Sequence, residues 1–301
     1  MSSMSFARGK STATWSLKEK TKAVIRQFRF FFAIPPMLVI VATFIAVRNY
    51  DLARLFWFSL SFIFVGGFLS SVNNTLDAQT DRSSKLMDTQ NPVATGELSY
   101  REAQTMNLLL PVLSLIAAVL AGPYSVGLPI MAVMLVTLYD VKPFRLKDRP
   151  LGVLIIPLSQ CIPFYFGYTS ATSSYVPPPW VVAVFTFLYF NTATVTHHVP
   201  DMELDLKLGI RNFVTTYGSE MARRYDMVSV FLAAVILTIS VVVGYLSILG
   251  LPLLLLSVAR QLRVMHSGAR ALRDPVVVKK FLSGLLPNSV AVTISILGSM
   301  R

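Results

Sequence analysis

Four aspartates form two pairs with the same spacing, and each pair follows a long apolar segment. Asp77 and Asp81 make the first pair, and Asp201 and Asp205 make the second. On a helix an i, i+4 spacing places both carboxylates on one face, where two like charges repel each other. Mg²⁺ relieves such repulsion, and it is commonly held by one or two carboxylates together with substrate phosphates. The pattern predicts a magnesium site for a lipid that carries a diphosphate.

Further polar residues accompany the two pairs. Asn73 lies on the same helical stripe as the first pair and offers an amide oxygen. A short loop between the pairs contains Tyr139, Arg145 and Lys147. Arginine can bind anionic oxygens in a bidentate manner, and lysine adds a point charge. His197 stands four residues before the second pair, and an imidazole could contact diphosphate or accept a proton, or simply end a helix by bonding to the backbone.

The remaining acidic residues of the polar loops carry no repeated spacing. Single carboxylates at such positions are usually solvated or bonded locally. We therefore assign structural or solvated roles to Glu97, Asp88, Asp140, Asp148 and Glu203.

The composition is typical of a polytopic membrane protein. The 301 residues are 54% hydrophobic and only 14% charged. About 20 apolar residues are needed to cross the hydrocarbon core of a bilayer as a helix. The sequence predicts an all-α membrane protein with nine transmembrane helices in a bundle, at 30–47, 55–75, 104–121, 125–139, 151–170, 179–197, 227–245, 246–260 and 281–299.

The basic residues predict the orientation. Nearly all of the 27 lysines and arginines lie before the first segment or in alternate loops. The positive-inside rule then places the N-terminus in the cytosol, the C-terminus outside, and the four aspartates in a polar cap that faces the cytosol. The net charge of +12 lies on short loops, which favours an anionic cytosolic leaflet as partner and not a nucleic acid.

The N-terminal segment 1–29 is basic and precedes the domain of residues 30–301. Ser16 and Glu19 predict a capping box, and the following residues alternate apolar and basic faces, which is typical of a helix in the membrane interface. Ser99 and Glu102 predict a second capping box before the third segment. Similar Thr, Gly and Glu residues follow both aspartate pairs, which suggests a parallel repeat of segments 1–4 and 5–8.

Together these motifs resemble the UbiA superfamily of intramembrane prenyltransferases. The resemblance covers nearly the whole chain, and two aspartate motifs with a basic loop between them are far more specific than either motif alone. The chain departs from the superfamily at Asn74, often an aspartate there, and at His197, often a lysine. The matching residues are Asn73, Asp77, Asp81, Tyr139, Pro143, Arg145, Lys147, Asp201, Glu203, Asp205 and Gly209.

The resemblance implies a Mg²⁺-dependent transfer of a polyprenyl group from an allylic polyprenyl diphosphate to a lipophilic or aromatic acceptor. The four aspartates would hold the metal, while the residues that bind the diphosphate would be Asn73, Tyr139, Arg145 and Lys147. We favour an aromatic quinone precursor as acceptor. A glycerol lipid, a carotenoid and a tetrapyrrole remain alternatives.

A cation-binding transporter is the main alternative of another class. Transporters usually hold ionisable groups in the middle of their spans, where those groups mark the ion path. Here all four aspartates lie at the ends of apolar segments, which favours an enzyme.

Overall fold

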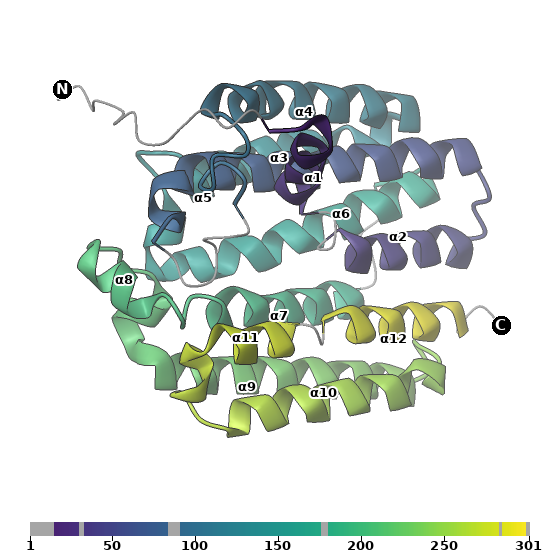
Figure 1. Ribbon diagram of the computed structural model, residues 1–301. Helices are drawn as coiled ribbons and strands as arrows, with labels where there is room; N and C mark the ends of the chain where they lie inside the picture. Colours follow the sequence, from purple (N-terminus) through teal and green to yellow (C-terminus); the bar gives the residue numbers. More distant parts are fainter. Residues whose placement is uncertain (1–14, 30–32, 84–90, 176–179, 283–284, 299–301) are drawn as a thin grey trace.

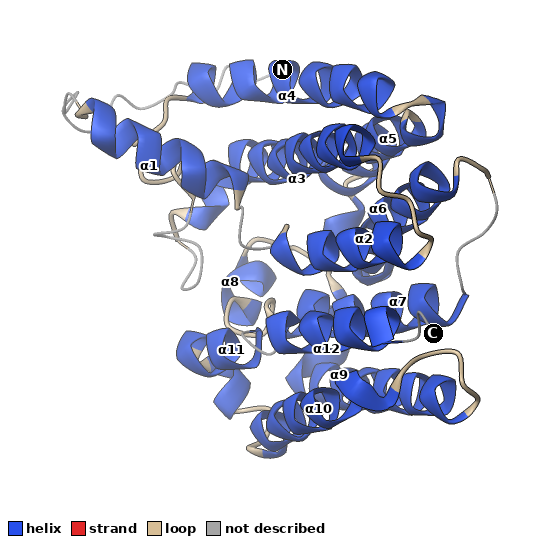
Figure 2. Ribbon diagram, turned by 90° about the vertical axis from the view of Figure 1, so that its right-hand side faces the viewer, coloured by secondary structure: helices blue, strands red, loops and turns tan. Residues whose placement is uncertain are grey.

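The computed structural model describes residues 15–29, 33–83, 91–175, 180–282 and 285–298. This part of the chain is helical throughout and contains no strand (Figures 1 and 2). The helices are α1 (Leu17–Phe28), α2 (Ile34–Ala46), α3 (Leu52–Asp81), α4 (Tyr100–Ala121), α5 (Gly127–Asp140), α6 (Ile155–Thr172), α7 (Trp180–Thr196), α8 (Met202–Lys207), α9 (Phe213–Val242), α10 (Leu251–His266), α11 (Pro275–Leu282) and α12 (Leu285–Gly298). Short 3₁₀ turns join several of them, namely η2 (Pro123–Ser125), η3 (Leu146–Asp148), η4 (Pro150–Leu154), η5 (Ile248–Gly250) and η6 (Ala271–Arg273).

Six of the nine predicted segments form helices that are long and apolar enough to cross a membrane. These candidates are Leu52–Asp81, Tyr100–Ala121, Pro123–Asp140, Pro150–Thr172, Phe213–Val242 and Ile248–His266. The other three predicted segments correspond to α2, α7 and α12. Within the described residues these helices have 13, 17 and 14 residues and fall short of the length of the six.

The long helices lie side by side, and their apolar side chains form two main clusters. One cluster joins α7, α9, α10 and α12 around Leu237 and Leu254. The other joins α2, α3, α5 and α6 around Phe44 and Phe58. Contacts of α2 with α12 and of α6 with α7 connect the two halves. The bundle thus brings together two groups of helices, each of which carries one aspartate pair at its end.

The loops that carry the polar motifs gather at one end of this bundle. In Figure 1 the C-terminal ends of α3, α5 and α7 point to the left, where α8 and the start of α9 also lie. Helix α3 begins at the N-cap Asp51, whose carboxylate accepts a hydrogen bond from the amide of Arg54. It then continues beyond the predicted apolar segment and includes both aspartates of the first pair in its last turns.

Helix α1 packs against α3 and the segment that follows the first aspartate pair. The predicted capping boxes Ser16–Glu19 and Ser99–Glu102 are both present, at the starts of α1 and α4. Ala23 is fully buried against this surface, whereas the side of α1 that carries Leu17 is exposed.

Candidate active site

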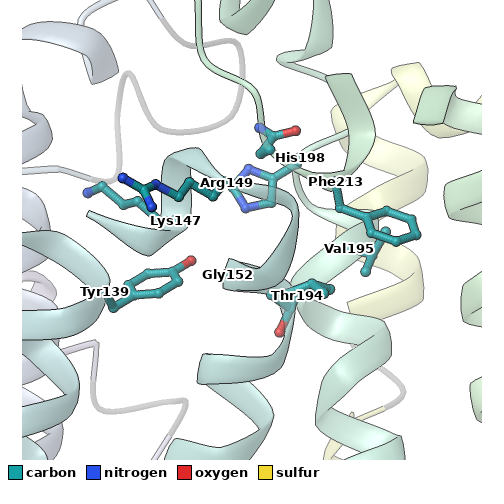
Figure 3. A pocket seen from close by; sticks show the side chains of 10 residues that line it. Tyr139, Lys147, Arg149, Gly152, Thr194, Val195, His198 and Phe213 are labelled. Atoms are coloured by element: carbon teal, nitrogen blue, oxygen red, sulfur yellow. The ribbon is translucent and has the colours of Figure 1, made fainter. Parts of the chain in front are cut away.

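A pocket opens where the two halves of the bundle meet. Figure 3 shows Tyr139, Lys147 and Arg149 on one side of it, and His198 and Phe213 on the other. The first group comes from the end of α5 and the turns η3 and η4, and the second from the end of α7 and the start of α9. The full lining consists of Tyr139, Lys147, Arg149, Gly152, Val153, Thr194, Val195, His198, Asn212 and Phe213.

Asp77 is bound by both cations of the basic loop. Lys147 Nζ donates to Asp77 Oδ2 at 2.5 Å, and Arg145 Nη2 donates to Asp77 Oδ1 at 3.1 Å. The amide of Asn73 adds a hydrogen bond to Asp77 Oδ2 at 3.1 Å. The structure thus brings Asn73, Arg145 and Lys147 together around Asp77.

Each of these cations also binds a second carboxylate from its own loop. Lys147 Nζ lies 2.7 Å from Asp140 Oδ1, and Arg145 Nε lies 2.6 Å from Asp148 Oδ2. Burial alone would lower the pKa of Arg145, but Asp77 and Asp148 outweigh it and the net shift is upward. Arg145 adopts a left-handed backbone conformation with φ 36°, which is uncommon for a residue other than glycine. The two ion pairs hold the guanidinium in that position.

Asp81 has a separate partner from the segment that follows. Asn91 Nδ2 donates to Asp81 Oδ2 at 2.8 Å, and Asn91 Oδ1 accepts from the amides of Val93 and Ala94. Asn91 therefore links the carboxylate of Asp81 to the backbone amides of the turn that Asn91 begins.

The second pair is arranged in a corresponding way. Asp201 is the N-cap of α8, and Asp205 lies one turn further along that helix. Asn212 Nδ2 donates to Asp205 Oδ2 at 2.7 Å, while Asn212 Oδ1 caps α9 by accepting from the amide of Thr215. Burial raises the pKa of Asp205 to about 6; Asn212 lowers it, and nearby carboxylates, Asp201 and Asp77 among them, raise it.

His197 and His198 lie just past the end of α7. Helix α7 ends at Thr196, so no continuous helix carries His197 onto the face of the second pair. The rings of His197 and His198 contact each other with centroids 4.0 Å apart, and His198 lines the pocket. Burial lowers the pKa of His198 well below its ordinary value, so this imidazole is neutral.

Asn74, which departs from the superfamily pattern, faces α1. Its Oδ1 accepts a hydrogen bond from the guanidinium of Arg29, and its Nδ2 donates to Gln27 Oε1 at 3.1 Å. Asn74 therefore connects α1 to α3, and its neighbours Asn73 and Thr75 take other directions around the helix.

Gly152 allows η4 to lie against η3. A Cβ at this position would stand 2.2 Å from the carbonyl oxygen of Leu146 and 2.9 Å from the Cα of Lys147. Both are backbone atoms and cannot rotate away. The close approach fixes the backbone from which Lys147 extends into the site.

The structure brings most of the predicted site residues together and adds others. Tyr139 and Lys147 line the pocket, and Arg145 and Asn73 bind Asp77. Within the described ranges, no three His, Cys, Asp or Glu side chains converge as a metal cluster. The sequence analysis did not predict roles for Asn91, Arg149, Gly152, His198 and Asn212. Asp88, which was assigned a structural or solvated role, lies outside the described residues.

Comparison with known proteins identifies the family. The model of the UbiA prenyltransferase family matches residues 33–284, and the chain belongs to this family. With six helices able to cross a membrane, it is an integral, multi-pass membrane protein of the prenyltransferase class.

Two relatives and one solved structure illustrate the similarity. The probable homogentisate phytyltransferase 2 of Oryza sativa subsp. japonica is 27% identical over 174 residues, which cover 55% of this chain and only 45% of that protein. The 4-hydroxybenzoate octaprenyltransferase of Francisella tularensis subsp. mediasiatica (strain FSC147) is 22% identical over 227 residues, covering 74% and 78% of the two chains. The fold is shared with a UbiA homologue from Archaeoglobus fulgidus bound to GPP and Mg²⁺, with a TM-score of 0.71, 20% identity, and coverage of 91% and 99%.

Proposed function

We propose that this protein transfers a polyprenyl group from an allylic polyprenyl diphosphate to an aromatic quinone precursor in the membrane, with Mg²⁺ as cofactor. The observation that carries the proposal is that both loop cations bind Asp77 of the first aspartate pair, and that one of them, Lys147, also lines the pocket between the two halves of the bundle. Membership of the UbiA prenyltransferase family supports the same reaction class.

The carboxylates fit Mg²⁺ by their chemistry. Mg²⁺ takes oxygen ligands and is usually held by one or two carboxylates plus substrate phosphates. Asp81 and Asp205 each accept a hydrogen bond at Oδ2 from an asparagine, which orients the carboxylate. We assign the metal to Asp77, Asp81, Asp201 and Asp205. When bound, the metal would act as a Lewis acid on the diphosphate oxygens.

The residues of the basic loop would bind and neutralise the diphosphate. Arg145 and Lys147 lie beside Asp77, and their positive charges would stabilise the negative charge that develops on the leaving group. Asn73 and Tyr139 would contribute hydrogen bonds at the same end. Because ionisation of the allylic C–O bond leaves a carbocation, the apolar walls at Val195 and Phe213 would keep water from it.

The pocket also suits an acidic aromatic acceptor. Two relatives are named for acceptors of this kind, 4-hydroxybenzoate and homogentisate. Arg149 lines the pocket, and a guanidinium binds a carboxylate in a bidentate manner. Phe213 and His198 add aromatic rings to the same lining. These features favour an aromatic acid over a neutral lipid.

We extend the proposal to the membrane topology. Helices α2, α7 and α12 lie alongside the six longer helices in Figure 1, so we propose nine membrane helices with the polar motifs in a cap at one end. The distribution of lysine and arginine supports a cytosolic N-terminus and cap, an external C-terminus and a contact with the anionic leaflet. Leu17 and Ile25, which are 83% and 53% exposed on α1, would enter the membrane interface.

The proposed function can be tested with purified protein and radiolabelled geranylgeranyl diphosphate. The acceptors would be 4-hydroxybenzoate, homogentisate, a glycerol lipid, a tetrapyrrole and a carotenoid, each with Mg²⁺ and with EDTA. We expect a prenylated aromatic acid that EDTA abolishes. A product formed only with a non-aromatic acceptor would reject the acceptor class. No product with any acceptor, together with no Mg²⁺-dependent binding of the diphosphate, would reject the enzyme.

His197 offers a smaller test of the same site. We expect His197→Ala to lower turnover about tenfold or more and to change the pH profile, because an imidazole titrates near neutrality and positioned bases contribute by proton transfer. The measurement is kcat between pH 5.5 and 8.5 for both proteins. An unchanged profile would show that His197 ends the helix and takes no part in the reaction.

A further inference from the structure

Asp140 and Lys147 form a buried ion pair next to the first aspartate motif. Their side chains are 4% and 8% exposed, and Lys147 Nζ lies 2.7 Å from Asp140 Oδ1. The same Nζ lies 2.5 Å from Asp77 Oδ2. Lys147 thus pairs with two carboxylates. We assign Asp77 as a ligand of the metal, whereas Asp140 belongs to neither aspartate motif.

The arrangement differs from a simple ion pair in its distribution of charge. Two cations, Arg145 and Lys147, are matched with three carboxylates, because each cation holds Asp77 and also has a carboxylate of its own. Asn73 Nδ2 joins the group by donating to Asp140 Oδ1 at 2.9 Å and to Asp77 at 3.1 Å. Asp140 is therefore bound on two sides and stays in place if Asp77 turns away.

Both oxygens of Asp77 are engaged by these cations, Oδ1 by Arg145 and Oδ2 by Lys147. A carboxylate that coordinates a divalent cation must give up at least part of such ion pairing. Removing the partner of a buried charge is strongly unfavourable. Asp140 offsets part of this cost because it remains bound to Lys147, and a second anionic partner is needed to replace Asp77.

Lys147 also has a donor to spare. An ammonium group carries three N–H donors, and the two carboxylates use two of them. The residue lines the pocket as well (Figure 3). Anionic oxygens that enter the pocket can therefore be bound by Lys147 without any movement of its backbone.

We infer that Lys147 exchanges partners during substrate binding: it neutralises Asp77 first, then turns to the diphosphate as Asp77 takes up the metal, while Asp140 keeps the ammonium in place. Asp140 is thus a positioning residue for the diphosphate. The inference rests on the proposed function. It requires that metal and diphosphate bind cooperatively, because the diphosphate supplies the partner that lets Lys147 release Asp77.

Binding of Mn²⁺, followed by electron paramagnetic resonance, tests this exchange in the purified full-length protein. The wild type should bind Mn²⁺ weakly alone and at least about tenfold more tightly with geranylgeranyl diphosphate, a coupling of ordinary size. Lys147→Met should bind Mn²⁺ alone at least about tenfold more tightly than the wild type, since Asp77 has lost a competing cation. In this variant the effect of diphosphate on Mn²⁺ affinity should be smaller than in the wild type, because only direct ligation of the metal by the phosphates remains.

A double variant protects the test against misfolding. Lys147→Met alone leaves Asp140 buried without its cation, so Lys147→Met/Asp140→Asn removes both charges, and its Mn²⁺ affinity without diphosphate should also exceed that of the wild type. If neither variant binds Mn²⁺ more tightly, the exchange is rejected, while the proposed function stands. If the wild type binds no Mn²⁺ even with diphosphate, the proposed function itself fails.

Asp140 is tested by the kinetics of its variants. Asp140→Asn should raise KM for the diphosphate about tenfold while kcat changes by less than about threefold, because the ammonium is no longer held toward the pocket. Asp140→Glu should bring the KM for the diphosphate most of the way back to the wild-type value. The control is Glu220→Gln, whose carboxylate pairs with Arg223 and Arg224 at a half-exposed site and whose loss should leave KM unchanged. A lower KM in Asp140→Asn would overturn the inference, since it would mean that Asp140 only repels the diphosphate.

Discussion

Replacing Asp77 or Asp201 with alanine is expected to reduce prenyl transfer by at least about a thousandfold, because a metal held by fewer carboxylates no longer stabilises the leaving group. Each aspartate belongs to a different pair, so either change removes one side of the proposed metal site. Asp77→Ala should leave the protein folded, since Lys147 keeps Asp140 and Arg145 keeps Asp148. Turnover of labelled geranylgeranyl diphosphate is the measurement, with thermal unfolding in detergent as the check on folding.

Glu203 provides a control within the second motif. Its side chain is 64% exposed and pairs only across the surface with Arg273. Exposed ion pairs of this kind contribute about 0–1 kcal/mol. Glu203→Gln should therefore keep turnover within about twofold of the wild type. Near-normal turnover in both aspartate variants would refute the proposed site.

Gly152→Ala is expected to lower turnover about a hundredfold although the residue carries no functional group. The added methyl would meet the carbonyl oxygen of Leu146 at 2.2 Å, so the backbone beside Lys147 must shift. Displacements of about 1 Å at a catalytic position can cost a hundredfold in rate. Overpacking of this kind also destabilises a protein by about 1–3 kcal/mol. The readouts are turnover, the KM for the diphosphate, which should rise, and the melting temperature, which should fall.

Gly66 supplies the matched control for this substitution. It lies within α3, a Cβ there would meet nothing within 4 Å, and its backbone is helical. Gly66→Ala should preserve turnover and stabilise the helix by up to about 1 kcal/mol. If the two alanine variants behave alike, the packing of η4 on η3 does not control the position of Lys147.

The sequence predicted that both aspartates of the first pair lie on one face of a helix. Helix α3 extends through Asp77 and Asp81, as that i, i+4 spacing requires. The basic loop was predicted to bind the diphosphate. In the structure Arg145 and Lys147 pair with Asp77, a contact that the sequence alone did not predict.

Other parts depend on the way distant segments pack. Nothing in the sequence separates Asp140 from a solvated loop acid, because its burial comes from the return of Lys147 onto the end of α5. The apolar pattern predicted a segment that ends at residue 197, and α7 indeed ends at Thr196.

A signal for Asn91 and Asn212 was present but was noticed only in part. Both asparagines begin similar segments, Asn-Pro-Val-Ala-Thr and Asn-Phe-Val-Thr-Thr, just before the Thr, Gly and Glu residues of the suspected repeat. In both segments the asparagine binds the second aspartate of the preceding pair. The two segments therefore share a structural role: the asparagine that begins each one orients the second aspartate of the preceding pair.

The contacts of α1 have a practical consequence for anyone who shortens this protein. Gln27 is fully buried and donates to Ser71 of α3, and Arg29 donates to Asn74. A version that starts at the first apolar segment would expose these partners on α3 and also free Glu97 from Arg26. The backbone oxygen of Asn74 accepts a hydrogen bond from Asn91, which also binds Asp81. A displacement of Asn74 would therefore also disturb the position of Asp81. Expression vectors should therefore keep residues 15–29, and a purification tag is better placed at the other end of the chain.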